Sequence, residues 1–409
     1  MIQRYFLLPI LLCLLSTCQS TYQAKDYDFP KPIDTTTRPI DRQEKKVYTL
    51  ASGISADNLF DGARLNGFEQ MDDDKIRAII SPENEPINSS PYYAFRLWSE
   101  AAKKVVLELH YEGAKHRYWP KISKDGQTWN LLVAEDLRYD ADSTHVFISL
   151  NVNTDTTWIA AQELINSSDV RAWCEEQAKH PDLSLSDIGK STLGREMLFM
   201  EIGRGEATKK DIVVIMSRQH PPETTGYLAM QAFVEEIMAD HIIAQAFREK
   251  YRIMVFPLMN PDGVDMGHWR HNAGGVDLNR DWAYYNQPET RQVADFIVQT
   301  AKENKSKVVL GLDFHSTYHD VYYTNKATTS AIPSFQDYWL LGINQSIGEV
   351  INERPSDLGA PVSKNWFLTQ FNAVGITYEI GDNTPRDFIK RKGETSAEEM
   401  MQLLILRGE

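Results

Sequence analysis

The second half of the chain alternates short apolar runs with stretches of helical periodicity, and this alternation limits its fold more than any other feature. The apolar runs are continuous: IVVIMS, RIMVFPLM, VVLGLDF and ITYEI. Helices are predicted between them, near residues 223–240, 288–303 and 334–353. Continuous apolar runs are typical of strands buried on both faces, as in a sheet covered by helices. Residues 169–409 are therefore predicted to form an α/β domain.

The region before this domain has a different pattern. Residues 47–165 contain runs with strand periodicity, such as YYAFRLWS, KVVLELHY and FISLNVN, and an Asp-Gly pair in SKDGQTW that is typical of a hairpin turn. Short strands separated by turns predict a small all-β sandwich domain. Its histidines, His110, His116 and His145, are scattered along the sequence, so we expect no catalytic site in this domain.

The N-terminal segment indicates export. Arg4 precedes the apolar run YFLLPILLCLL, which is too short to span a bilayer and is typical of a secretory signal. The run ends in LSTC, which resembles a bacterial lipoprotein box. Residues 1–18 are thus predicted to be a signal peptide, with Cys18 either lipidated, as the box favours, or in a segment lost by simple cleavage. Residues 19–46 are polar and contain several prolines and threonines, so a flexible tether is expected.

This segment predicts a protein on the periplasmic or cell-surface side of a bacterial membrane, attached only through the lipid anchor at Cys18. The formal net charge of −14 argues against a nucleic-acid partner, since such proteins usually carry a basic patch. Beyond Cys13 and Cys18 the chain has one further cysteine, Cys174. It is expected to be a buried apolar side chain, without a disulfide or a thiolate zinc cluster.

Polar side chains follow or end each predicted strand of the α/β region. Because ligands of open α/β sheets bind beyond the carboxyl ends of the strands, we expect these side chains to share one crevice. In chain order the four strands deliver His220 and Glu223; then Arg270, Asn279 and Arg280; then His315; and finally Glu379. No glycine-rich nucleotide motif is present, so a nucleotide cofactor is not expected.

The residue types in this crevice point to hydrolysis with zinc. His220, Glu223 and His315 form a two-histidine, one-carboxylate set, and catalytic zinc sites use three such ligands and leave a fourth position for water. Zinc lowers the pKa of bound water to about 7. Glu379 is the candidate general base, since a carboxylate within an apolar strand is costly to bury without a role. Arginines can hold a carboxylate or polarise a carbonyl oxygen.

Six motifs in order resemble a known family. HPPE, NPDG, HWR, GVDLNRDW, FHS and YEIGD together resemble the carboxypeptidase A-like zinc peptidases over about residues 170–409. The preceding β-rich segment, with YYAFRLWS and YWPKISKDGQTW, looks like the N-terminal domain of the cytosolic carboxypeptidase branch. The resemblance implies a mixed sheet of the eight-stranded type flanked by helices, and one zinc ion per chain.

The resemblance also implies residue roles. His220, Glu223 and His315 look like the zinc ligands, and Glu379 looks like the general base. Arg270 looks like the arginine that polarises the scissile carbonyl. Asn279 and Arg280 look like the clamp on the C-terminal carboxylate of the substrate.

One family feature is missing. Pancreatic-type members carry a mobile tyrosine on a loop before the catalytic glutamate, and the corresponding residues 354–371 contain no tyrosine. Trp366 or Phe367 is the candidate to close the pocket instead. The basic run RDFIKRKGE, which begins at Arg386, is read either as a subsite for acidic side chains or, as we favour, as a solvated face.

Other polar neighbours of the motifs have supporting interpretations. His268, His271 and His319 are expected in loops or behind the ligands, because the three-ligand set is already complete. Asp277 and Asp313 either orient ligands and clamp or make loop hydrogen bonds; both readings stay open.

Three functions are compatible with these patterns. The favoured one is a zinc metallocarboxypeptidase that removes C-terminal amino acids from peptides and proteins. An alternative keeps the zinc chemistry but acts on cell-wall stem peptides or N-acyl amino acids. A third, from another class, is a lipoprotein binding module without turnover.

Overall fold

The computed structural model describes residues 22–140, 143–326 and 330–407. The predicted signal peptide, residues 1–18, and its Cys18 lie outside the described residues. No helix in the described ranges is both long enough and apolar enough to cross a membrane.

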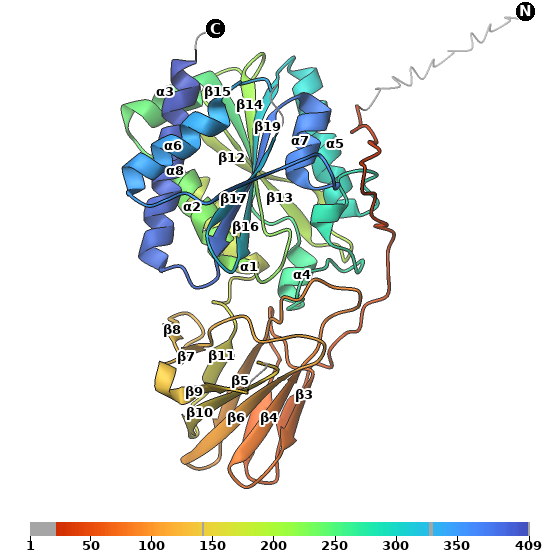
Figure 1. Ribbon diagram of the computed structural model, residues 1–409, viewed down its shortest axis with the longest axis vertical. Helices are drawn as coiled ribbons and strands as arrows, with labels where there is room; N and C mark the ends of the chain where they lie inside the picture. The colour runs from red at the N-terminus through yellow and green to blue at the C-terminus, as the bar shows by residue number, and fades with distance from the viewer. Residues whose placement is uncertain (1–21, 141–142, 327–329, 408–409) are drawn as a thin grey trace, which may run out of the picture.

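The N-terminal region forms a β-sandwich, as the sequence predicts (Figure 1). One sheet has the order β1-β2-β5-β11-β7-β8 and the other the order β3-β4-β6-β10-β9. The Asp-Gly turn joins β7 to β8 in an antiparallel hairpin. The bounds are β1 Val47–Thr49, β2 Ile54–Asp57, β3 Gly67–Gln70, β4 Lys75–Ile80, β5 Ala94–Ser99, β6 Lys103–Tyr111, β7 Lys121–Ser123, β8 Asn130–Leu131, a short 3-10 helix η1 Ala134–Asp136, β9 Leu137–Tyr139, β10 His145–Val152 and β11 Thr157–Ala160.

The C-terminal region is built on a mixed eight-stranded sheet, which confirms the predicted fold class. Its order is β12-β13-β15-β14-β16-β19-β17-β18. The central strands β15, β14, β16 and β19 run parallel to one another. On either side of this centre, β13 pairs antiparallel with β15 and β17 pairs antiparallel with β19. The strand bounds are β12 Leu183–Lys190, β13 Glu196–Ile202, β14 Asp211–Ser217, β15 Tyr251–Phe256, β16 Val308–Thr317, β17 Val321–Asn325, β18 Glu353–Ser356 and β19 Val374–Gly381.

Helices cover both faces of this sheet, which explains why its central strands are apolar without alternation (Figure 1). In β14, Val213 and Ile215 join the core under α2, α3, α6 and α8, while Val214 and Met216 join the core under α5 and α7. Cys174 is buried in the first of these cores and is free, as predicted. The helix bounds are α1 Ser167–Gln177, α2 Thr224–Met238, α3 Ile242–Lys250, α4 Pro261–Asp265, a 3-10 helix η2 Leu278–Arg280, α5 Pro288–Glu303, α6 Phe335–Ile347, α7 Ser363–Phe371 and α8 Arg386–Leu406.

The predicted helix over residues 334–353 is shorter in the structure. Helix α6 ends at Ile347, where Gly348 takes a left-handed backbone conformation with φ of 78°. Glycine tolerates this conformation without the strain that a Cβ atom would add, and it commonly ends helices in this way. The chain then enters β18, which adds an edge strand to the sheet.

The expectation of a flexible tether over residues 19–46 does not hold for its described part. Residues 22–46 run in an extended path along the C-terminal region (Figure 1). Thr35 is buried, and its hydroxyl donates to Asp281 over 2.5 Å. The backbone N–H of Lys31 donates to the carbonyl of Gly359 over 2.8 Å. Polar composition prevents this segment from building its own core, but its polar groups are satisfied by a neighbouring domain. We call residues 22–46 the strap.

Candidate metal and active site

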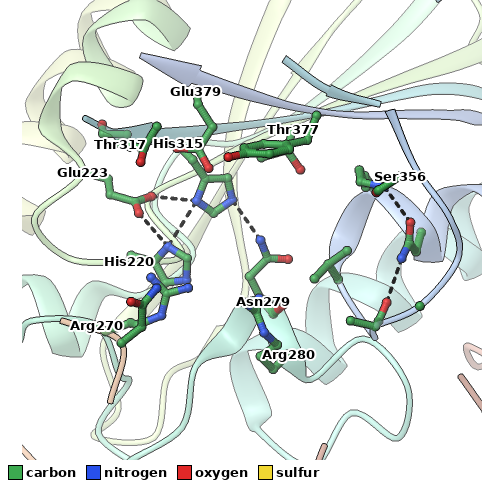
Figure 2. A pocket seen from close by; sticks show the side chains of 18 of the residues that line it. His220, Glu223, Arg270, Asn279, Arg280, His315, Thr317, Ser356, Thr377 and Glu379 are labelled. Atoms are coloured by element: carbon green, nitrogen blue, oxygen red, sulfur yellow. Dashed lines mark hydrogen bonds and ion pairs between the residues drawn. The ribbon is translucent and has the colours of Figure 1, made fainter. Parts of the chain in front are cut away.

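Neighbouring strands deliver the predicted metal ligands to one edge of the sheet. His220 lies in the loop after β14, and Glu223 follows it at the start of α2. His315 lies near the carboxyl end of β16, the strand beside β14. Glu379 of β19 stands opposite His315 in the register of the parallel pair. All four side chains line one cleft of about 450 Å³ (Figure 2).

The three predicted ligands converge on one point. Glu223 Oε1 lies 2.8 Å from His220 Nδ1, and Glu223 Oε2 lies 2.6 Å from His315 Nδ1. The two Nδ1 atoms are 3.2 Å apart. These residues are buried, and their ligand atoms lie within 4.8 Å of one another. The structure therefore brings together the whole predicted set.

The opposite nitrogens of both imidazoles are held by carboxylates. His220 Nε2 lies 2.8 Å from Asp277 Oδ1, and His315 Nε2 lies 2.7 Å from Asp313 Oδ2. A carboxylate on one ring nitrogen keeps the proton there and leaves the other nitrogen free to bind a metal. Of the two interpretations of Asp277 and Asp313, the structure therefore supports the one in which they orient the histidines.

This donor set fits zinc. With Nε2 protonated in each ring, two unprotonated Nδ1 atoms and a carboxylate face one another, and a metal cation placed between them would satisfy all three. Burial raises the pKa of Glu223, but His220 and His315 outweigh burial and hold this pKa far below its ordinary value. Glu223 therefore stays ionised and able to ligate.

Glu379 lies beside the ligands, and one of its carboxylate oxygens has no hydrogen-bond partner among the described residues. It lines the cleft, and its Oε2 is buried without a hydrogen bond among the described residues. Burial and the nearby Glu223 carboxylate raise the pKa of Glu379 to about 7. A carboxylate with a raised pKa and a free oxygen is suited to accept and return a proton near neutral pH.

The predicted substrate-binding residues line the same cleft. Arg270 is buried, and its Nε donates to Asp277 Oδ2 over 2.7 Å. Asn279 and Arg280 lie in η2, below His315 and to the right of Arg270 in the view of Figure 2. Asn279 Nδ2 lies 3.3 Å from His315 Nε2, and its Oδ1 accepts from the backbone of Ser363. Arg280 keeps about a third of its side chain exposed, which leaves its guanidinium accessible from the cleft.

Several lining residues carry no signal in the sequence. Lys31 of the strap and Arg117 of the sandwich reach the cleft from regions where we expected no site. Tyr323 of β17 and Lys364 of α7 line it from within the catalytic region. None of these residues belongs to a motif, so only the folded chain brings them to the cleft.

The residues expected to close the pocket do not do so. Trp366 and Phe367 are buried in the core between α5, α7 and the sheet. They face this core because α7 packs its apolar side against β16 and β19. The phenol group that lines the cleft is instead Tyr323, whose pKa is raised by burial and by the neighbouring charge of Glu379.

The remaining sequence candidates take supporting places. His268 Nδ1 hydrogen-bonds the carbonyl of His271, and His271 Nδ1 bonds Asn84 Oδ1. Arg386 forms an ion pair with Glu163 over 2.7 Å. No residue of the basic run 386–394 lines the cleft, so this run does not form a subsite for acidic side chains there.

A second histidine cluster lies in the sandwich. Glu108, His110 and His145 come together on the outer face of one sheet, since His110 and His145 are paired across β6 and β10. The Glu108 carboxylate is already balanced by Arg77 at 3.2 Å and Lys75 at 3.6 Å. Those cations would oppose a metal ion, so we read this cluster as a charge-balanced surface group.

Comparison with known families supports the same interpretation. The family model described as zinc carboxypeptidase matches residues 170–398, more than half of the chain. This chain belongs to the zinc carboxypeptidase family. The match spans all seven predicted site residues.

Relatives in other organisms agree with this membership. An uncharacterised protein of Zymomonas mobilis is 24% identical over 375 residues, which is 84% of this chain and 92% of that protein. Cytosolic carboxypeptidase 6 of Mus musculus is 30% identical over 136 residues, 32% of this chain and 25% of that protein. The chain thus aligns with about a quarter of the length of that cytosolic carboxypeptidase.

Solved structures confirm the fold over both regions. A metallo-carboxypeptidase from Burkholderia cenocepacia superposes with a TM-score of 0.69 at 19% identity, covering 86% of this chain and 98% of the other. A metallo-carboxypeptidase from Pseudomonas aeruginosa, solved in complex with (2-guanidinoethylmercapto)succinic acid, gives 0.69 at 20% identity, covering 86% and 100%. Because each match covers 86% of this chain and at least 98% of the other, the β-sandwich and the eight-stranded sheet recur together.

Proposed function

We propose that this protein is a zinc-dependent metallocarboxypeptidase that releases C-terminal amino acids from peptides. The observation that carries the proposal is the convergence of His220 Nδ1, His315 Nδ1 and the Glu223 carboxylate beside the unpaired oxygen of Glu379. Family membership supports a hydrolase of this class.

One zinc ion, held by His220, Glu223 and His315, would supply a Lewis acid that acidifies a water molecule and polarises the scissile carbonyl. Glu379 accepts the proton of the attacking water at its free oxygen. It then delivers this proton to the nitrogen of the leaving amino acid, so that the peptide bond breaks and a neutral amine departs.

Arginines and an amide complete the proposed reaction. Arg270 donates to the carbonyl oxygen as negative charge develops on it. Arg280 and Asn279 bind the free carboxylate beside the scissile bond, and this clamp makes the enzyme an exopeptidase. To bind substrate, the Asn279 amide would exchange its contact with His315 for one with the carboxylate.

A panel of substrates tests this proposal together with Glu379→Gln. We expect wild type to release the last residue of blocked peptides with free C-termini. The variant should bind about one zinc per chain, as a one-site arrangement requires, and should release none. If both proteins bind zinc and neither cuts any peptide, the carboxypeptidase assignment is wrong, and cell-wall stem peptides and N-acyl amino acids are the next substrates to assay.

We also propose that the protein is exported and anchored through Cys18. The support is the apolar run that ends in LSTC. Mass spectrometry of the mature N-terminus tests it: a diacylglyceryl group on Cys18 is expected, and an unmodified N-terminus after cleavage elsewhere would contradict it.

A further inference from the structure

The loop that carries Arg270 is built into the β-sandwich, although it belongs to the catalytic part of the sequence. This loop, residues 266–272, follows α4. Trp269 is completely buried within the sandwich core, and its Nε1 donates to the carbonyl of Tyr92 over 3.0 Å. Gly267 has φ of 66° and lies so close to Ala63 that a Cβ atom would come within 2.4 Å of the Ala63 carbonyl oxygen.

A single carboxylate of the sandwich binds the backbone of this loop. Glu83 lies between β4 and β5 and is completely buried. Its Oε2 accepts from Trp269 N over 2.8 Å, and its Oε1 accepts from Arg270 N over 2.9 Å and from His271 N over 2.6 Å. Three successive amides thus donate to one side chain.

Glu83 is held in its charged form. Burial alone would raise its pKa, but His268, Arg64 and His271 hold the pKa of Glu83 below its ordinary value. Hydrogen bonds from N–H groups to an ionised carboxylate are about twice as strong as those between neutral groups. The position of the loop backbone is therefore set by the sandwich.

The side chain of Arg270 extends from this fixed backbone into the cleft. Its Nε donates to Asp277 Oδ2 over 2.7 Å, and the other oxygen of Asp277 holds the ligand His220. Arg270 is thus fixed at two points, by Glu83 at its backbone and by Asp277 at its guanidinium. The chain of contacts runs from the sandwich to a metal ligand.

We propose that Glu83 is a positioning residue, which places Arg270 for the developing negative charge on the scissile carbonyl and so makes the β-sandwich part of the active site. This inference rests on the proposed carboxypeptidase function. It predicts that loosening the loop harms the chemical step more than substrate binding, because a shift of about 1 Å in a catalytic group can cost about a hundredfold in rate.

The test substitution is Glu83→Gln. It replaces one acceptor oxygen with an NH2 group, which cannot accept the hydrogen bonds that the loop N–H groups donate. We expect kcat to fall by about 10- to 100-fold, with KM within about threefold of wild type and zinc binding unchanged. Glu108→Gln is the matched control, since Glu108 is another buried sandwich carboxylate, and it pairs with Arg77 and His145 of the sandwich. The control should lose stability without losing kcat. If Glu83→Gln proves insoluble, Glu83→Asp keeps the charge and should lose kcat to a smaller extent.

A double-mutant cycle with Arg270→Ala separates positioning from general damage. If Glu83 acts through Arg270, adding Glu83→Gln to Arg270→Ala lowers kcat by less than about twofold. Additive losses, or a kcat for Glu83→Gln equal to that of Glu108→Gln, would overturn the inference while leaving the proposed function intact.

If wild type cleaves no C-terminal residue, the proposed function fails, and the inference about catalysis fails with it. The contact itself is then tested by hydrogen exchange. The amides of residues 269–271 should exchange faster in Glu83→Gln and remain protected in Glu108→Gln. Equal exchange in both variants would show that Glu83 does not fix the loop.

Discussion

At the scale of single residues, the candidate site depends on which nitrogen of each histidine faces the cleft. Asp277 and Asp313 bind the Nε2 atoms of His220 and His315, so both Nδ1 atoms are left for the metal. Such carboxylate partners fix the ring orientation and raise the basicity of the ligand. Asp277 and Asp313 are therefore as much a part of the site as the ligands that they orient.

Replacing Asp313 with asparagine tests this role. Asp313→Asn removes the charge behind His315, and we expect zinc affinity to fall by about 10- to 100-fold. Competition with a chelator of known affinity measures the change. Asp187→Asn, at an exposed position of β12, is the control and should bind zinc like wild type. Equal affinities for wild type and Asp313→Asn would refute the role.

Lys364 provides a pH-dependent test of the cleft. Its side chain is buried, and its Nζ donates to Asn325 and Asn365. Burial lowers the pKa of Lys364 to about 8, against the opposing effect of Asp357. A lysine is charged only below its pKa, so the positive charge in the cleft should decline as the pH rises through about 8.

Substrates that end in glutamate should therefore bind more weakly above about pH 8, whereas those that end in leucine should change less. The measurement is the ratio of the two KM values from about pH 6.5 to 9.5, a range on both sides of that pKa. In Lys364→Met the ratio should no longer depend on pH over this range. A ratio that is flat in wild type would mean that the charge of Lys364 does not affect binding of the terminal side chain.

At the scale of elements, the strap is the part most at odds with its sequence. Thr35 donates to Asp281, accepts from Asn286 Nδ2 over 3.0 Å, and its carbonyl accepts from Gln287 over 2.7 Å. These contacts tie the strap to the segment between η2 and α5. The strap is therefore held in its extended conformation by contacts with the C-terminal region.

Thr35→Val should lower the free energy of unfolding by about 1–3 kcal/mol, because it leaves buried polar groups of its partners without a hydrogen bond. Urea denaturation measures the change. Thr36→Val is the control, since Thr36 is exposed and its hydroxyl and N–H donate to Asp34 within the strap. If both variants unfold at the same urea concentration as wild type, the strap contributes nothing measurable to stability.

Much of the fold was predictable because its signals are local. Continuous apolar runs mark β14, β15, β16 and β19, and polar residues follow at their carboxyl ends, so the metal ligands could be named from the sequence. The ordered path of the strap was not predictable. Its polar composition shows that it cannot form a core of its own, but it does not show that the strap binds along the C-terminal region. Lys31, Arg117 and Tyr323 reach the cleft only through tertiary contacts, which leave no periodic trace in the sequence.

The position of Trp366 and Phe367 shows a similar limit. They lie in a region where the family resemblance suggests a mobile loop, but helix α7 turns both rings into the core. Their apolar character gave equal support to a pocket lid and to a helix face packed on the sheet. The packing of α7 against β16 and β19 decides between these two interpretations in favour of the helix face.

At the scale of the whole molecule, the cleft belongs to three parts of the chain. The C-terminal region provides His220, Glu223, His315 and Glu379, from two strands of the sheet and from the segment that joins β14 to α2. The sandwich provides Arg117, and the strap provides Lys31. Arg117 also holds Asp382, just beyond the strand of Glu379, through hydrogen bonds of 2.8 and 3.2 Å. The sandwich thus contacts the C-terminal region both at Glu83 and at Arg117.

The most direct test of the account is to remove and restore zinc while following release of a C-terminal amino acid. Treatment with a chelator should abolish release, and about one equivalent of zinc per chain should restore it, because one three-ligand site is expected to hold one ion. In His315→Ala the same addition should restore nothing. If chelator-treated protein releases amino acids as fast as untreated protein, or if His315→Ala recovers with one equivalent, the zinc site at His220, Glu223 and His315 is not the catalytic centre.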